Sequence, residues 1–155
     1  MIGKTGKNIP KEKALEYVAG YVAGDDVSAR KWQRDPAYAG VVPQWCFSKG
    51  FDRYAPLGPC IVSQQVIGDA GKLQLQTHVN GEVRQDTNTD DLIFGIAEMI
   101  SFLSQGTTLQ KGSLIMTGTP SGMFLGYVYV TNGRCCDGDE SAKIFERWGY
   151  CGGLH

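Results

Sequence analysis

The chain has 155 residues, a formal net charge of −1 and 42% hydrophobic residues, which suffice for one domain with its own core. The near-zero charge gives no broad attraction to nucleic acid or to an anionic membrane, so neither is an expected partner. No apolar run reaches the roughly 18 residues that a membrane span needs. Lysines interrupt the N-terminal segment, so we expect no signal peptide there.

The first third of the chain predicts a short helix, a strand and a loop. Pro10 fits the first position of a helix, and residues 11–17 are good helix formers. Residues 18–27 alternate small and apolar side chains through several glycines, which is typical of a strand. Residues 34–45 contain two prolines and a glycine and are expected to form a loop.

The middle of the chain predicts a β-hairpin followed by a helix. Polar and apolar residues alternate over 73–79, and Asn80-Gly81 is a strong signal for the hairpin turn. Residues 87–91 offer helix caps, and Gly106 suits the end of the helix that follows. The apolar face of this helix is expected to comprise Leu92, Ile93, Ile96, Ile100 and Leu103. Short strands with few helices and 21 glycines indicate a mixed, β-rich α+β domain.

Asp26, at the end of the first predicted strand, is a candidate metal ligand. A carboxylate at a strand end can point into a cavity, and its oxygens suit Mg²⁺ or a similar hard cation such as Mn²⁺ or Ca²⁺. In a strand, Gly20 and Gly24 would share a face with Asp26 and leave room for a ligand, although the packing of another strand explains them equally well. Asp25 would face away from Asp26. The alternative for Asp26 is a solvated surface carboxylate.

Arg30 and Gln33 are candidate substrate-binding residues. They stand three residues apart on an expected helical turn, so their side chains would share a face. A guanidinium and an amide on one face can bind a substrate carboxylate or carbonyl oxygen. The alternatives are a surface turn for Gln33 and a structural ion pair for Arg30, and the latter is the favoured one.

Lys49 is the candidate catalytic residue. It stands between Phe47 and Phe51, with Asp52 close in sequence. A partly desolvated ammonium can neutralise the negative charge that develops on an enolate. The alternative is a lysine that extends its ammonium into solvent past the neighbouring rings.

A predicted strand at Leu114–Met116 ends in the turn Thr117-Gly118-Thr119-Pro120. Its hydroxyls and free backbone N–H groups can hold an oxyanion or a carboxylate, so Gly118 and Thr119 are candidate substrate contacts. A plain tight turn is the competing interpretation.

His78 and the cysteines have structural interpretations. His78 lies on the polar face of the hairpin strand and is expected at the surface. Cys46 and Cys60 have apolar sequence neighbours and are expected to pack as small hydrophobic residues, as in a reducing compartment. A zinc site in the tail is a remote alternative, because adjacent cysteines are poorly spaced for one. Its ligands would be Cys135, Cys136, Cys151 and His155.

Four motifs follow one another along the chain. They are Asp25–Gln33, Phe47–Pro59, Val79–Gln85 and Gly112–Gly122. In this order and spacing they resemble the fumarylacetoacetate hydrolase family, in particular its small fumarylacetoacetate hydrolase domain-containing and acylpyruvate hydrolase branch. The resemblance covers about residues 2–122, which we expect to be one domain. Residues 123–155 read as a divergent tail, in which 127–130 are expected to form a strand.

The resemblance implies a β-sandwich roll with short helices, a homodimer, and a divalent metal held in part by Asp26. It implies that Lys49 lies in the active site and that Gln33 and Thr119 contact the substrate. The expected activity is hydrolysis of a carbon–carbon bond in small 2-oxo acids or 1,3-dicarbonyl compounds, of the acylpyruvate or fumarylacetoacetate type. The alternative within the family is an oxaloacetate tautomerase or decarboxylase.

The chain departs from the family pattern at its front. Family members carry a Glu-x-Glu pair just before the segment that begins here at Ile2, and a lid with a catalytic His and Glu before that. With neither in the chain, we expect an incomplete fold, a metal that is weakly held or absent, and little or no hydrolase activity. A non-catalytic structural or interaction domain is therefore the second alternative. The expected location is cytoplasmic or mitochondrial, since a targeting segment would precede this sequence.

Overall fold

The computed structural model describes residues 1–119, 130–131 and 134–135 and divides the chain into two compact units. The first unit comprises Met1–Ala23, Pro59–Leu75 and Asp86–Pro120. Of the described residues, the second comprises Gly24–Gly58, Gln76–Gln85, Val130–Thr131 and Arg134–Cys135. Each unit is described by itself.

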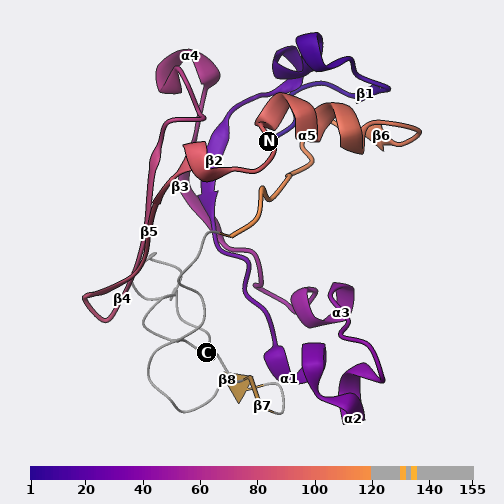
Figure 1. Cartoon of the computed structure of the whole chain (residues 1–155), viewed down its shortest axis with the longest axis vertical. Coiled ribbons are helices and arrows are strands. Elements are labelled where there is room, and N and C mark those ends of the chain that lie inside the picture. The colour runs from indigo at the N-terminus through magenta and orange to yellow at the C-terminus, as the bar shows by residue number, and fades with distance from the viewer. Residues whose placement is uncertain (120–129, 132–133, 136–155) are drawn as a thin grey trace, which may run out of the picture. The chain divides into compact units, whose positions relative to one another are not determined.

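The chain is built of short helices and short strands, mixed along its length (Figure 1). The helices are η1 (Lys11–Tyr17), α1 (Arg30–Arg34), α2 (Pro36–Ala39), α3 (Cys46–Lys49), α4 (Gln64–Ile67), η2 (Thr89–Asp91) and α5 (Ile96–Leu103). The strands are β1 (Gly6–Lys7), β2 (Tyr21–Gly24), β3 (Leu57–Val62), β4 (Gln74–Val79), β5 (Glu82–Asn88), β6 (Thr108–Leu109), β7 (Val130–Thr131) and β8 (Arg134–Cys135). Within the described residues they pair as β1–β6, β2–β3, β4–β5 and β7–β8, which confirms the mixed α+β class.

The core of the first unit forms where η1 packs against α5 (Figure 1). Its buried residues are Ile2, Ile9, Ala14 and Ile100. Ser104, just after α5, is buried with them, and its hydroxyl accepts a hydrogen bond of 2.9 Å from the backbone N–H of Ile9. That bond satisfies a backbone donor that would otherwise be buried without a partner.

Both predicted helices are present, with shifted starts. The helix at Lys11–Tyr17 is a 3₁₀ helix, and Pro10 is the extended residue before it rather than its first residue. Helix α5 begins only at Ile96, so Ile93 lies outside it and is 90% exposed. The expected capping segment caps η2 instead, since the Asn88 side chain accepts a bond from the N–H of Asp90.

The hairpin prediction is confirmed at Asn80-Gly81, where both residues have positive φ (52° and 87°), as a type I′ turn requires. The predicted strand over 18–27 is real only at Tyr21–Gly24, and Asp26 lies beyond its end. The expected loop over 34–45 also contains α2, which Asp35 caps by accepting a hydrogen bond from the N–H of Ala37.

The predicted strand at Leu114–Met116 is wrong. The backbone of Ile2 bonds to Gly112 and Ser113 just before it, and among the described residues no ladder of backbone bonds continues along 114–116. In the tail, β7 includes Val130 of the strand predicted over 127–130. The remainder of that prediction lies outside the described residues.

The cysteine prediction is also wrong, because Cys46 and Cys60 are both exposed. Cys46 opens the four-residue helix α3, whose buried position is taken by Ser48. Cys60 lies on β3, where only Gly58 is buried. Within the described residues, no helix has the length and apolar character needed to cross a membrane.

Candidate functional site

Four of the six candidate site residues lie in the second unit. The segment after β2 carries Asp26, α1 carries Arg30 and Gln33, and α3 ends at Lys49. The backbone N–H of Ala29 donates a hydrogen bond of 2.9 Å to the carbonyl of Ser48, which ties the Asp26 segment to α3. Because α3 is a single helical turn, this bond helps to fix where Lys49 projects.

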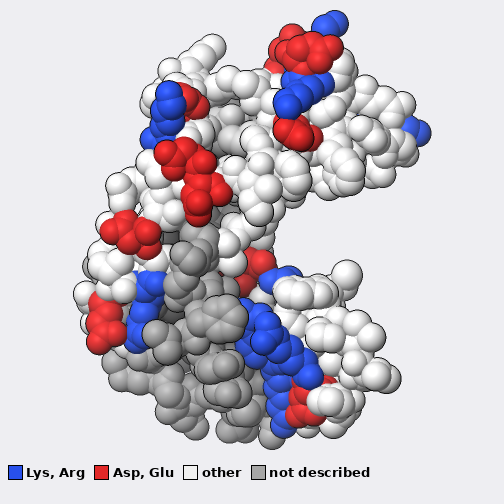
Figure 2. All heavy atoms as spheres, viewed as in Figure 1, with Lys and Arg blue, Asp and Glu red and all other residues white. Residues whose placement is uncertain are grey.

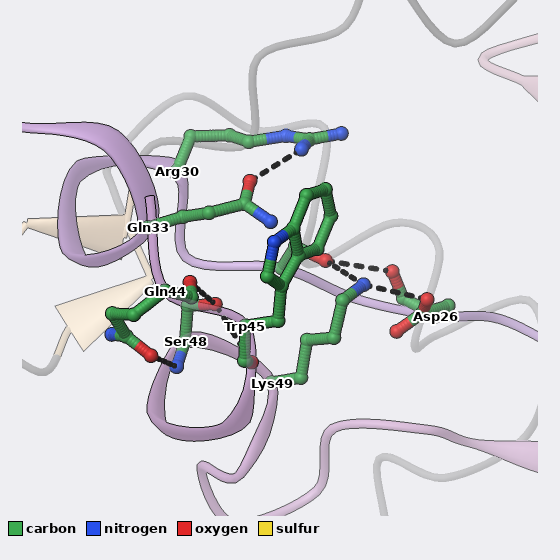
Figure 3. A network of polar contacts seen from close by, with 8 residues as sticks. Asp26, Arg30, Gln33, Gln44, Trp45, Ser48 and Lys49 are labelled. Carbon is green, nitrogen blue, oxygen red and sulfur yellow. Dashed lines mark hydrogen bonds and ion pairs between the residues drawn. The ribbon is translucent and has the colours of Figure 1, made fainter. Parts of the chain in front are cut away.

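Lys49 and Asp26 form an ion pair (Figure 3). The Lys49 Nζ lies 2.6 Å from Asp26 Oδ2 and 2.7 Å from Ser28 Oγ. The side chain of Lys49 is 27% exposed, and its ammonium lies 5.6 Å from the centroid of the Trp45 ring. The partner of Lys49 is thus Asp26, 23 residues away, rather than its sequence neighbour Asp52.

Arg30 and Gln33 share a face of α1, as their spacing predicts. The Arg30 Nη1 donates a hydrogen bond to Gln33 Oε1 (Figure 3). Among the described residues Arg30 forms this bond rather than the ion pair that we favoured for it. Gln33 is fully buried, which rules out the alternative of a surface turn. Among the described residues, its buried Nε2 has no hydrogen-bond partner.

Asp25 has a perturbed acidity. Desolvation by the surrounding protein raises the pKa of its carboxyl, and the like charge of Asp26 raises it further. The backbone N–H of Asp26 and the positive charge of Lys49 act in the opposite direction but do not cancel the rise. Two adjacent carboxyls thus have different surroundings, since Asp26 has the ammonium of Lys49 as a direct partner.

Asp26, Arg30, Gln33 and Lys49 are called the cluster below. Gln44 connects its two helices, α1 and α3, and was not among the residues predicted from the sequence. Its Nε2 donates a bond of 2.8 Å to the carbonyl of Trp32, in α1. Its Oε1 accepts bonds of 3.0 and 3.3 Å from the N–H groups of Phe47 and Ser48, at the start of α3. A polar residue two positions before a helix was the available signal, since such side chains satisfy the unpaired N–H groups of a first turn.

Aromatic rings brace the same helices. Trp32 makes edge contacts with Tyr38 and Phe47, with ring centroids 4.7 and 5.3 Å apart. Phe47 also contacts Phe51, and Phe51 contacts Tyr54. Each such contact contributes about 0.5–1.5 kcal/mol beyond the area that it buries. The cluster therefore has a rigid base despite the shortness of its helices.

Replacing Gln44 by Leu is expected to lower the free energy of unfolding by about 1–3 kcal/mol, because three backbone groups lose their partner. The change should appear as a lower melting temperature by circular dichroism. Gln65→Leu, at an exposed position on α4, is the matched control and should leave the melting temperature nearly unchanged. Equal effects of the two substitutions would contradict the connecting role of Gln44.

Gly118 and Thr119 belong to the first unit and are described separately from the cluster. Gly118 has a φ of 101°, in the region that favours glycine, so this backbone conformation depends on it, although residues 113–119 contain no assigned turn. His78 is exposed, as predicted, and its Nε2 lies 3.3 Å from Gln76 Oε1. The tail zinc site lies outside the residues whose side chains the structure describes, which contain no group of three or more possible metal ligands.

The α+β fold and the cluster define a class of protein: a mixed domain whose second unit holds a lysine–carboxylate pair and an arginine–glutamine pair. Figure 2 shows basic side chains over α1, which carries Arg30, Lys31 and Arg34. The particular family follows from the sequence. The chain belongs to the fumarylacetoacetate hydrolase family, because a family model described as "Fumarylacetoacetate (FAA) hydrolase C-terminal" matches residues 1–144. The match extends beyond the expected limit at Gly122.

Curated relatives and solved structures agree with this assignment. Maleylpyruvate hydrolase of Aquipseudomonas alcaligenes is 44% identical over 123 residues, which are 79% of this chain and 39% of that protein. Mitochondrial oxaloacetate tautomerase Fahd2a of Rattus norvegicus is 40% identical over 79% of this chain and 38% of its own length. The crystal structure of fumarylpyruvate hydrolase from Pseudomonas aeruginosa, in complex with Mn²⁺ and pyruvate, is similar with a TM-score of 0.70 and 40% identity. That likeness covers 78% of this chain and 51% of the other.

The chain thus spans about two fifths of the length of these curated relatives.

Proposed function

We propose that this chain forms the substrate-binding part of a divalent-metal-dependent hydrolase that cleaves a carbon–carbon bond in small 2-oxo acids of the acylpyruvate type. The observation that carries the proposal is the Lys49 ammonium, which is held by Asp26 and Ser28. Among the described residues, one N–H of this fixed ammonium has no acceptor, and such a positive charge suits an oxygen that becomes negative during the reaction. Family membership and the names of the relatives support the substrate class.

Each residue of the cluster would have its own role in cleavage of the carbon–carbon bond. Water adds to the acyl carbonyl, the carbon–carbon bond breaks, and its electron pair moves onto the 2-oxo acid fragment as an enolate. Lys49 stabilises the enolate oxygen, and the enolate then takes up a proton to give pyruvate. Arg30 binds the substrate carboxylate, and Gln33, whose Nε2 is unpaired among the described residues, donates to a carbonyl oxygen. Thr119 and Gly118, in the first unit, remain separate candidates for substrate contact.

Substrate access to Gln33 requires a local movement of the protein. Because it is fully buried, a substrate reaches its Nε2 only after the atoms that cover it have moved. The bond from Arg30 already holds the amide in place, so such a movement would expose a preformed donor.

Asp26 is the proposed ligand for the divalent metal, Mg²⁺, Mn²⁺ or Ca²⁺. The described residues do not by themselves fit such an ion, because they contain no group of three or more possible ligands and Asp26 Oδ2 is already paired with Lys49. A divalent cation needs six or more oxygens, several of them from the protein. The steps proposed above therefore rest on the side chains of this chain alone.

An oxaloacetate tautomerase is the second candidate function. Two curated relatives of that name, from Rattus norvegicus and Xenopus laevis, are 40% and 41% identical to this chain. Tautomerisation also proceeds through an enolate, so the same Lys49 charge would serve it. Decarboxylation of oxaloacetate, and a non-catalytic interaction role, remain further proposals. The homodimer and the mitochondrial or cytoplasmic location also stay predictions.

The test is a titration of the full chain with pyruvate, with and without Mn²⁺, followed by NMR. We expect millimolar binding that shifts the signals of α1 and α3, because two cations and an amide face one ligand. Assays of acetylpyruvate cleavage and oxaloacetate tautomerisation then separate the two candidate reactions. Absence of any pyruvate binding with saturating Mn²⁺ would overturn the proposal.

A further inference from the structure

Ser28 is a buried hydroxyl with two partners at the cluster. It is 8% exposed, its Oγ lies 3.2 Å from the carbonyl of Asp26, and the Lys49 ammonium lies 2.7 Å away. An ammonium only donates hydrogen bonds, so Ser28 accepts from Lys49. The single hydroxyl hydrogen is then donated to the Asp26 carbonyl. One donated and one accepted hydrogen bond therefore set the orientation of the Ser28 hydroxyl.

The position of Ser28 relative to Lys49 is set by the backbone. Its neighbour Ala29 is fully buried, and the N–H of Ala29 donates to the carbonyl of Ser48, directly before Lys49. The two residues are therefore held at a constant spacing by a bond that does not involve their side chains. Asp26, by contrast, has a side chain that is 41% exposed and more open to solvent.

We propose that Ser28 is the positioning residue for Lys49: its hydroxyl and the Asp26 carboxylate take two of the three ammonium N–H groups and aim the third at the ligand. A lysine side chain has four rotatable bonds, and binding an anion with a freely moving ammonium costs entropy. Ser28 removes much of that freedom before the ligand arrives. The catalytic meaning of this role rests on the proposed function, whereas the placement of the ammonium does not.

The experiment compares Ser28→Ala with Ser28→Thr in the full chain. Lysine ammonium NMR signals are visible only when hydrogen bonds slow the exchange of their protons with water, so they report the placement of Lys49 directly. We expect a Lys49 ammonium signal in the unmodified chain, its loss in Ser28→Ala, and its return in Ser28→Thr, which keeps the hydroxyl. Pyruvate affinity should fall by about five- to tenfold in Ser28→Ala and recover in Ser28→Thr.

Ser63→Ala is the matched control, since Ser63 precedes α4 and its side chain caps nothing there. It should change neither the signal nor the affinity. An unchanged Lys49 signal in folded Ser28→Ala would overturn the inference, as would a failure of Ser28→Thr to restore it. If the unmodified chain binds no pyruvate but the signal behaves as expected, the proposed function fails and the positioning role stands.

Discussion

Replacing Lys49 by Met is expected to weaken pyruvate binding by the full chain by about ten- to a hundredfold, the largest effect of any single change in the cluster. Methionine keeps most of the length and apolar character of the lysine stem, so packing against the Trp45 ring is largely preserved. What is lost is the ammonium, and with it the partner of Asp26. The uncompensated carboxylate would then repel the anionic ligand. A titration followed by NMR or calorimetry measures the change.

Lys31→Met is the control for this prediction. Lys31 lies on α1 in the same unit, and its ammonium lies over the ring of Tyr38 at 4.7 Å, so the substitution removes the same charge from a similar aromatic contact. It should change pyruvate affinity by no more than about twofold, because a solvent-screened charge contributes little at a distance. An equal loss in both variants would mean that net charge, and not the placement of Lys49, governs binding.

Sequence could predict the parts of the cluster that depend on local spacing. Arg30 and Gln33 stand three residues apart, and any helical turn brings such a pair together. The Lys49–Asp26 pair spans 23 residues, and its formation depends on the backbone bond from Ala29 to Ser48, which no periodicity encodes. Sequence analysis proposed each of the two residues separately and missed that they bind each other.

The same distinction explains the fold. Asn80-Gly81 specifies its hairpin because the turn itself demands two residues that tolerate positive φ. The apolar face predicted for α5 was correct at Ile100 and wrong at Ile93, because the helix begins at Ile96, four residues after the apolar pattern begins at Leu92. Element limits depend on tertiary contacts, so an apolar residue next to a helix can remain exposed.

Two explanations were open for Gly20, directly before β2, and for Gly24, at its end: space for a ligand or the packing of another strand. The structure decides between them for Gly20. A Cβ at this position would lie 2.5 Å from the carbonyl oxygen of Val62 and 2.8 Å from a methyl group of Ile61. The close neighbour is the backbone of β3, which cannot move aside without disturbing its pairing with β2. Gly20 thus makes room for a strand and not for a ligand.

Gly20→Ala is therefore expected to lower the free energy of unfolding by about 2–3 kcal/mol, in the upper part of the range for overpacked sites. This loss outweighs the stabilisation that alanine usually gives over glycine by restricting the unfolded chain. The melting temperature should fall by roughly 5–10 °C for a chain of this size. Gly95→Ala is the control, because a Cβ there would meet nothing within 4 Å and its φ of −68° suits any residue. A Gly20→Ala chain as stable as the Gly95→Ala chain would contradict the close approach of β3. Thermal unfolding by circular dichroism decides between the two outcomes.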